Sequence, residues 1–288
     1  MRKLQLGLGI SLALTAAAGL LATSAIGQGA TANKFAAASV DDKRQIAADK
    51  EPGTWMSAGR TYDEQRYSPL TAISKANIKD LKLAWYGDLD TERGQESTPV
   101  VVDGVLYVTS AWSKVFAYNA KTGVPLWKYD PKVDPSVGQL ACCDVVNRGV
   151  AAYKGKIYLG ALDGRLIALD GKTGQVVWST QTTDLKQPYT ITQTPRVAHG
   201  MVFIGNGGAE YSVRGYVSAY DAETGKLKWR FYTVPSDPAN DHDNQPELKK
   251  AANTWSGEWW KYGGGATAWD TILYDPKTNL VYFGTGNG

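Results

Sequence analysis

The chain has 288 residues, of which 43% are hydrophobic and 20% are charged, with 31 Gly and 12 Pro. This length and apolar content suffice for a buried core and exclude an intrinsically disordered chain. Thirty-one basic and 28 acidic side chains give a net charge of +3, which excludes a strongly basic nucleic-acid-binding protein. Ten Trp and sixteen Tyr favour the half-buried surfaces of sheets over a helical bundle. The composition therefore predicts an all-β protein.

Residues 1–30 have the layout of an export signal. Arg2 and Lys3 precede a largely apolar run over residues 4–21, and small residues follow it. A single membrane anchor is the alternative, because this run approaches the length that spans a bilayer. The small-residue tail favours cleavage, so we expect residues 31–288 to be a periplasmic domain. Peripheral association with the membrane stays open.

Three segments repeat at an interval of 51 residues. AYNAKTGVPLW ends at Trp127, ALDGKTGQVVW at Trp178 and AYDAETGKLKW at Trp229. Each predicts a strand, a tight turn whose Gly takes a positive φ, and a second strand that carries the Trp. Another predicted hairpin precedes each segment, so that one repeat contains four short strands. This pattern is typical of β-propeller blades, and each Trp is expected to pack between neighbouring blades.

The repeat is incomplete at both ends. Trp85 lies 42 residues before Trp127 and is expected to end a preceding, partial blade. A polar insertion interrupts the pattern after Thr233, and within it PELKKAANTW predicts a short helix. The chain stops soon after the next predicted hairpin. Because an open propeller exposes a sheet edge, we expect residues 31–288 to be an N-terminal fragment, roughly half of a ring.

Most common catalytic motifs are absent from the sequence. It contains no GxSxG, HExxH or GxxxxGK, and neither His199 nor His242 has a partner at a metal-ligand spacing. GNGGAE at residues 205–210 differs from a dinucleotide loop, because Glu replaces the last Gly and no helix is predicted to follow. The DHD at residues 241–243 lacks the Gly and closing Glu of a calcium loop, which favours a solvated turn.

Cys142 and Cys143 are adjacent and are the only cysteines. A bond between neighbours closes an eight-membered ring and strains the intervening peptide, whereas an exported protein meets an oxidising compartment. The residues alone leave a vicinal disulfide and two free thiols as equal alternatives. A zinc site is not indicated, since further ligands at the usual spacing are missing.

Polar residues occupy corresponding places in successive repeats. Glu96 precedes the first strand of one predicted blade, residues 142–148 precede that of the next, and Thr192 precedes that of the third. In a propeller these places lie at one end of the central channel, where ligands bind. Loops that follow are expected to bring four more residues to this end: Glu210, Thr267, Trp269 and Asn287. A role as plain turn residues is the alternative for each of them.

Several motifs, in this order, resemble the pyrroloquinoline quinone (PQQ)-dependent alcohol dehydrogenases. They are GTWMSAGRTYDEQRYSPL, ACCDVVNRG, GNGGAE, VRGYVSAYDAETGKLKWRF, GGGATAWD and YFGTGNG. The resemblance covers essentially all of residues 31–288. It is greatest to the quinohaemoprotein alcohol dehydrogenases and smaller to methanol dehydrogenase large subunits. It implies the N-terminal part of an eight-bladed propeller in an enzyme that oxidises small alcohols to aldehydes and passes electrons to a cytochrome c.

The resemblance also implies the roles of individual residues. A disulfide between Cys142 and Cys143 would form one face of a PQQ cleft and Trp269 the other, while Arg148 would pair with a cofactor carboxylate. Six further cofactor contacts are expected: Glu96, Thr192, Gly207, Gly208, Ala209 and Thr267. Glu210 and Asn287 match the ligands of calcium, with a lanthanide as the alternative ion.

The catalytic base is expected outside this sequence. The resemblance places the Asp that removes the alcohol proton roughly forty residues beyond Asn287 and so past Gly288, which predicts that this chain alone is inactive. The sequence has no CxxCH motif, so that haem c would need a further C-terminal domain. Two other functions are weighed: a non-catalytic propeller scaffold of the cell envelope, and a quinoprotein that acts on sugars or polyvinyl alcohol.

Overall fold

The computed structural model describes residues 38–270 and 272–288. The expected signal at residues 1–30 lies outside them. Every described residue belongs to one compact unit. Within the described ranges, no helix combines the length and the apolar character needed to cross a membrane. Antiparallel sheets dominate this unit, which confirms the all-β prediction.

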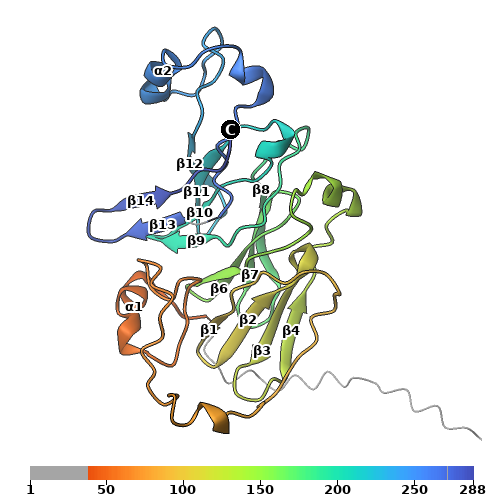
Figure 1. Cartoon of the computed structure of the whole chain (residues 1–288), viewed down its shortest axis with the longest axis vertical. Coiled ribbons are helices and arrows are strands. Elements are labelled where there is room, and N and C mark those ends of the chain that lie inside the picture. Colours follow the sequence, from red (N-terminus) through yellow and green to blue (C-terminus); the bar gives the residue numbers. More distant parts are fainter. Residues whose placement is uncertain (1–37, 271) are drawn as a thin grey trace, which may run out of the picture. The chain divides into compact units, whose positions relative to one another are not determined.

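Three four-stranded sheets follow one another along the chain, each with its strands in chain order (Figure 1). The first consists of β1 (Val100–Val102), β2 (Val105–Thr109), β3 (Val115–Asn119) and β4 (Pro125–Tyr129). The second consists of β5 (Val150–Tyr153), β6 (Lys156–Gly160), β7 (Arg165–Asp170) and β8 (Val176–Gln181). The third consists of β9 (Arg196–Ala198), β10 (Met201–Ile204), β11 (Tyr216–Asp221) and β12 (Leu227–Tyr232). A hairpin of β13 (Ile272–Asp275) and β14 (Leu280–Phe283) begins a fourth unit.

The sheets stack as propeller blades around their first strands. β1 contacts β5, β5 contacts β9, and β9 contacts β13. Buried side chains fill the spaces between consecutive sheets, for example Val115 and Ile157 between the first two and Tyr158 and Val202 between the second and third. Because each sheet buries both faces against its neighbours, its inner strands read as nearly continuous apolar runs.

The predicted tryptophan packing joins each blade to the next. The indole N–H of Trp127 donates to the carbonyl of Gly171 at 3.1 Å, and that of Trp178 donates to the carbonyl of Ala222 at 3.0 Å. The turn glycine of the following blade lies against each ring: a Cβ on Gly174 would lie 2.6 Å from Trp127. Gly174 also has a φ of +72°, so both its conformation and its contact require the absence of a side chain.

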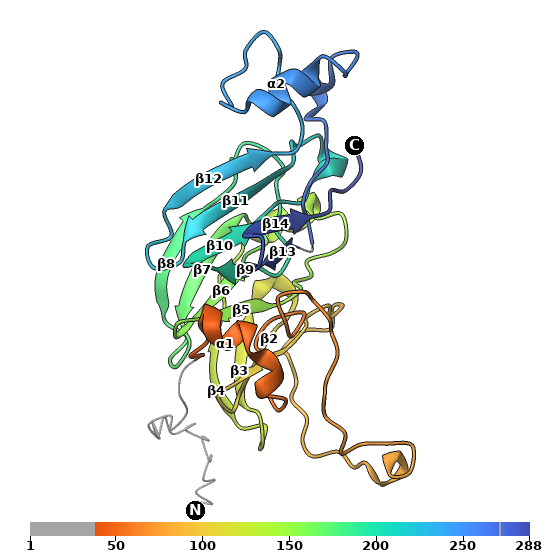
Figure 2. The same cartoon turned by 90° about the vertical axis from the view of Figure 1, so that its left-hand side faces the viewer.

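Trp85 packs in the same way although it lies in no strand. Its indole N–H donates to the carbonyl of Ala120 at 3.1 Å, and its ring lies against Gly123. The interpretation of Trp85 as the end of a partial blade therefore agrees with its packing, while residues 81–89 form no regular element. Figure 2 shows the stretch around the 3-10 helix η2 (Ile78–Asp80) extending away from the sheets.

The remaining helices are short. α1 (Asp42–Ile46) and η1 (Ala48–Lys50) precede the blades, and α2 (Pro246–Ala252) lies in the insertion, where PELKKAANTW predicted a helix. Pro246 suits the first turn of α2, because its missing N–H has no helical partner there. Four further 3-10 helices connect the strands: η3 (Ala111–Ser113), η4 (Pro135–Leu140), η5 (Ala209–Tyr211) and η6 (Trp259–Tyr262).

Candidate functional site

One pocket gathers the loops that precede the first strands of successive blades. It has a volume of about 600 Å³, its open mouth included. Its lining consists of Ala141, Cys142, Cys143, Arg148, Thr190, Thr192, Gly207, Gly208, Glu210, Thr267, Trp269 and Asn287. The structure thus brings together every site residue expected from the sequence except Glu96 and Ala209. These two lie next to lining residues, Glu96 on the Arg148 side chain and Ala209 directly after Gly208.

The Arg148 side chain contacts residues from three blades. Its Nη2 lies 2.8 Å from Oε2 of Glu96, which precedes β1, and its Nη1 donates to Oγ1 of Thr192, which precedes β9, at 2.5 Å. Its guanidinium carbon lies 5.0 Å from the ring centroid of Trp269, which precedes β13. An ion pair, a hydrogen bond and a cation–π contact therefore fix the direction of the guanidinium.

Trp269 belongs to a side of the pocket that two hydrogen-bonded segments form, around residues 266–269 and 286–287. The N–H of Gly286 donates to the carbonyl of Thr267, and the N–H of Ala266 donates to the carbonyl of Asn287, both at 2.8 Å. Thr267 is almost fully buried, whereas Trp269 is 43% exposed. The indole thus presents an open, flat apolar surface to the pocket, while Asn287 reaches the same wall from the second segment.

Glycines allow the opposite segment to approach closely. The N–H of Gly207 donates to the carbonyl of Thr190 at 2.8 Å. Gly208 has a φ of +106°, and a Cβ there would lie 2.6 Å from the carbonyl oxygen of Pro188. Only glycine fits this position. The turn leads directly into η5, which carries Glu210 at the pocket.

Sequence reasoning did not identify Ala141 and Thr190 as lining residues. Thr190 lies two positions before Thr192, and side chains two apart in an extended segment point to the same side, which is the signal that could have found it. Ala141 directly precedes the cysteine pair. Thr190 also pairs with Gly207, another lining residue, and no local sequence pattern predicts this contact.

The two cysteines are free thiols and both are exposed. The disulfide implied by the resemblance is therefore not present in this structure, and the open alternative of two thiols is the one observed. Desolvation at the pocket wall, the neighbouring Cys143 and the carboxylate of Glu210 raise the pKa of Cys142 to about 12, against a smaller opposing effect of Arg148. Cys142 is consequently protonated at neutral pH.

The donor set fits a flat, polyanionic quinone. Arg148 offers a directed cation for a carboxylate, Trp269 offers a planar surface, and the pocket has room for a fused ring system. The side chains of Glu210 and Asn287 offer at most three oxygen atoms, which is fewer than the six to eight that calcium takes. No cluster of three or more His, Cys, Asp or Glu able to hold a metal occurs within the described ranges. A cation here would need further oxygen atoms, from the cofactor, water or backbone carbonyls, to complete its shell.

The other motifs have structural roles. Asp243 forms an ion pair with Arg214, and the N–H of Asp243 itself donates to Asp241, as a polar turn would. His199 lies in the turn between β9 and β10, where its ring packs edge-on against Tyr274. Neither motif reaches the pocket.

Comparisons with known proteins show the family to which the chain belongs. A family model described as "PQQ: Glucose/ethanol/alcohol dehydrogenase, beta-propeller domain" matches residues 55–288. The quinohemoprotein alcohol dehydrogenase ADH IIB of Pseudomonas putida is 57% identical over 253 residues, which are 88% of this chain and 36% of that protein. The chain thus spans about a third of the length of the curated relatives it matches.

Solved structures show the same likeness. The quinohemoprotein alcohol dehydrogenase ADHIIG of Pseudomonas putida HK5 matches with a TM-score of 0.85 and 59% identity, over 88% of this chain and 37% of that one. A europium-containing methanol dehydrogenase matches with a TM-score of 0.78 and 38% identity, over 85% of this chain and 44% of that one. The chain therefore belongs to the family of PQQ-dependent alcohol dehydrogenases and contains part of the family's β-propeller domain.

Proposed function

We propose that this chain forms the PQQ-binding part of a periplasmic dehydrogenase that oxidises small alcohols to aldehydes and passes the electrons to a cytochrome c. The observation that carries this proposal is the single pocket that holds Arg148, Trp269, the cysteine pair, Glu210 and Asn287 together. A relative named 1-butanol dehydrogenase (cytochrome c), from Thauera butanivorans, is 49% identical over 204 residues, which supports the class of substrate and acceptor.

The residues of this chain would bind and orient the cofactor. Arg148 would pair with one of its carboxylates, and Glu96 and Thr192 keep the guanidinium in place for that contact. Trp269 would cover one ring face, and Cys142 and Cys143 would cover the other. When bound, PQQ supplies the capacity to accept two electrons from an alcohol, which the side chains that line this pocket do not provide.

Glu210 and Asn287 would hold a calcium ion beside the cofactor. Both are hard oxygen donors of the kind that calcium prefers, and a lanthanide, which shares this preference, is the alternative. A bound cation would act as a Lewis acid within the pocket. The proton of the alcohol must go to a base, which we place beyond Gly288. Haem c, where present, would likewise belong to a further domain.

The proposed export to the periplasm depends on residues 1–30. We propose that this segment is a signal peptide and that residues 31–288 are the exported part. The test is N-terminal sequencing of the protein recovered from the periplasm. A mature terminus close to residue 31 is expected, whereas a terminus at Met1 in a membrane fraction would favour the anchor.

Titration with PQQ in the presence of calcium tests the binding proposal. Saturable quenching of tryptophan fluorescence is expected, because Trp269 would stack on the quinone. Trp269→Ala should weaken binding by about tenfold or more, equivalent to roughly 1.4 kcal/mol of stacking. Trp255→Ala is the matched control, since Trp255 is 39% exposed and lies in the insertion, away from the pocket.

Two results would overturn the proposal. A folded protein that shows no saturable PQQ binding would favour the scaffold function instead. Equal losses from Trp269→Ala and Trp255→Ala would move the cofactor away from this pocket. The choice between alcohols and the sugars or polyvinyl alcohol of other quinoproteins is made by profiling substrates with the protein that includes the catalytic base.

A further inference from the structure

We propose that Asn147 is a positioning residue that holds Arg148 in its cofactor-binding direction without touching the pocket. Asn147 is 2% exposed and is not among the residues that line the pocket. The inference rests on the proposed function in one respect, namely that Arg148 is the cation that meets the cofactor. Its structural part, the link from Asn147 to Arg148, can be tested without any cofactor.

All the polar atoms of the Asn147 side chain are used. Its amide nitrogen donates to the carbonyl of Gly160 at 2.8 Å and to Oγ of Ser113 at 3.3 Å. Its amide oxygen accepts from the N–H of Gly149 at 3.1 Å. Asn147 thus holds the backbone of the residue that follows Arg148 and ties it to β6 and η3. We call these contacts the clamp. A carboxylate of the same shape could not make the two donations.

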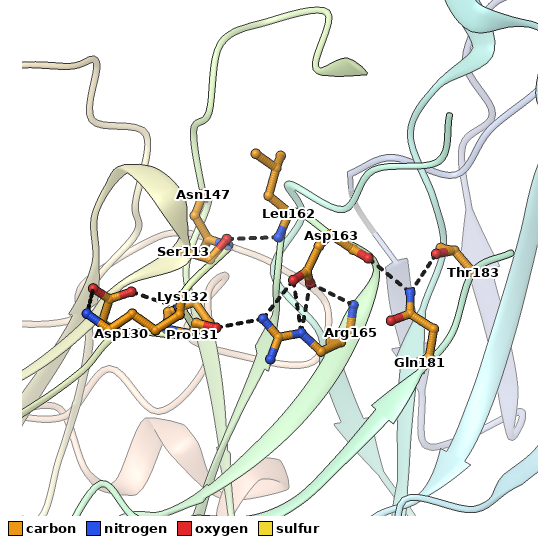
Figure 3. A network of polar contacts seen from close by, with 10 residues as sticks. All are labelled: Ser113, Asp130, Pro131, Lys132, Asn147, Leu162, Asp163, Arg165, Gln181 and Thr183. Carbon is orange, nitrogen blue, oxygen red and sulfur yellow. Dashed lines mark hydrogen bonds and ion pairs between the residues drawn. The ribbon is translucent and has the colours of Figure 1, made fainter. Parts of the chain in front are cut away.

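Ser113 is the second member of this clamp. Its Oγ also accepts from the N–H of Leu162 at 3.0 Å, so that it lies between Asn147 and the loop after β6 (Figure 3). Ser113 is fully buried and has a φ of +58°, next to Trp112 with a φ of +63°. Two consecutive non-glycine residues in the left-handed region are strained and persist only where surrounding contacts hold them.

The clamp joins the first two blades at the residue that precedes Arg148. Ser113 belongs to the first blade and Gly160 to the second, and Oγ1 of Thr109 in β2 donates to the carbonyl of Asn147 at 3.2 Å. The backbone of Arg148 is then held on both sides. Its N–H donates to the carbonyl of Thr192 at 2.9 Å and its carbonyl accepts from the N–H of Thr98 at 3.0 Å.

From this backbone position the Arg148 side chain contacts Glu96, Thr192 and Trp269. If the clamp is released, the segment that carries Arg148 can shift, and the guanidinium loses its fixed relation to those partners. A shift of about 1 Å in a binding group is enough to weaken a preorganised site strongly. Another tether of this loop, the ion pair between Arg93 and Asp144, has both side chains more than one-third exposed and is the weaker constraint.

The test compares Asn147→Asp with a matched variant elsewhere. Gln45 in α1 is 4% exposed, and its amide also donates to a serine Oγ, that of Ser57 at 3.1 Å, and to a backbone carbonyl, that of Arg60 at 2.9 Å. Gln45→Glu therefore removes the same chemistry far from Arg148. The first readout is the rate at which phenylglyoxal modifies Arg148 in cofactor-free protein, followed by peptide mass spectrometry. The second is the Kd for PQQ.

Asn147→Asp should raise the modification rate of Arg148 by about threefold or more and weaken PQQ binding by about tenfold. Gln45→Glu, at a comparable loss of thermal stability, should change neither quantity. If the two variants behave alike in both readouts, the positioning role is wrong. If wild-type protein does not bind PQQ while Arg148 is still exposed selectively by Asn147→Asp, the positioning role stands and the proposed function fails.

Ser113→Ala provides a second variant if Asn147→Asp does not fold. It removes one of the two acceptors and keeps the hydrogen bond to Gly160. A smaller rise in Arg148 modification, in the same direction, is expected. An unchanged rate in folded Ser113→Ala would contradict the proposal.

Discussion

The contacts of Arg148 depend on the correct assembly of the whole site. Its partners Glu96, Thr192 and Trp269 come from three different blades and meet only when those blades are stacked. The side chain is 19% exposed, so these contacts are partly shielded from water and from salt. Cys142 lies in the same pocket with a protonated thiol, because desolvation, then the neighbouring thiol and the Glu210 carboxylate, raise its pKa.

We predict that Cys142 reacts slowly with iodoacetamide at neutral pH, because its pKa of about 12 leaves little thiolate. The rate should rise steeply as the pH approaches that value. Unfolded, unreduced protein should gain two alkyl groups in its intact mass, one for each thiol. If the unfolded protein gains none until reductant is added, the cysteines are joined by the bond that the family resemblance implies.

At the scale of elements, the blades are joined by one repeated contact between a tryptophan and a turn glycine. Gly123, Gly174 and Gly225 each have a φ near +70° and each lies against the indole of the preceding blade. Trp229 is the next member of the series and is 38% exposed. Among the described glycines, none lies against its ring.

A comparison of two glycines separates the effect of backbone strain on stability from the effect of packing against an indole ring. Gly174 and Gly200 have nearly the same φ, +72° and +69°, but a Cβ on Gly174 would meet Trp127 at 2.6 Å and one on Gly200 would meet nothing within 4 Å. Gly200→Ala should cost about 1 kcal/mol of unfolding free energy, and Gly174→Ala about 2 to 4 kcal/mol. Urea unfolding measures both. Equal losses would mean that the indole contact adds nothing to stability.

On the scale of the whole described unit, the segment before the first blade ties distant parts together. Asp42 in α1 accepts hydrogen bonds from the hydroxyls of Tyr62 and Tyr153 at 2.9 and 2.7 Å, and from the N–H of His199 at 2.8 Å. It thereby joins α1 to the second and third blades. The ion pair between Glu64 and Arg196 adds a buried link to β9, with side chains 10% and 9% exposed.

The pH dependence of stability should reveal the contribution of Asp42. Burial alone would raise its pKa, but the hydrogen bonds from His199, Tyr153 and Tyr62 outweigh burial and lower the pKa. The ionised carboxylate therefore stabilises the fold above about pH 4, and this contribution is lost as the pH falls through the lowered pKa. Asp42→Asn should cost about 1 to 3 kcal/mol at pH 7 and much less at pH 2 to 3.

Thermal unfolding at a series of pH values measures this difference. Asp80→Asn, at an exposed position in η2, is the control and should track wild type. A constant difference between Asp42→Asn and wild type from pH 7 to pH 2 would contradict the assignment, because it would mean that the charge of Asp42 plays no part.

Local patterns in the sequence determined the blades. The spacing of Trp127, Trp178 and Trp229 predicted three four-stranded sheets, and the structure has them, because alternating strands, turn glycines and their flanking residues act over a few positions. The same repeat placed Glu96, Arg148 and Thr192 in corresponding loops. Loops in corresponding places meet at one end of a propeller, so most of the pocket could be named in advance.

Only the tertiary structure decided which partners those residues have. Thr190 and Ala141 entered the pocket unpredicted, and the cysteines are thiols in place of the implied disulfide. The clamp of Asn147 on Ser113 joins positions 34 residues apart, and the bond from Tyr153 to Asp42 joins positions 111 apart. Such contacts leave no periodic trace, because they depend on how the blades stack and not on the conformation of any one of them.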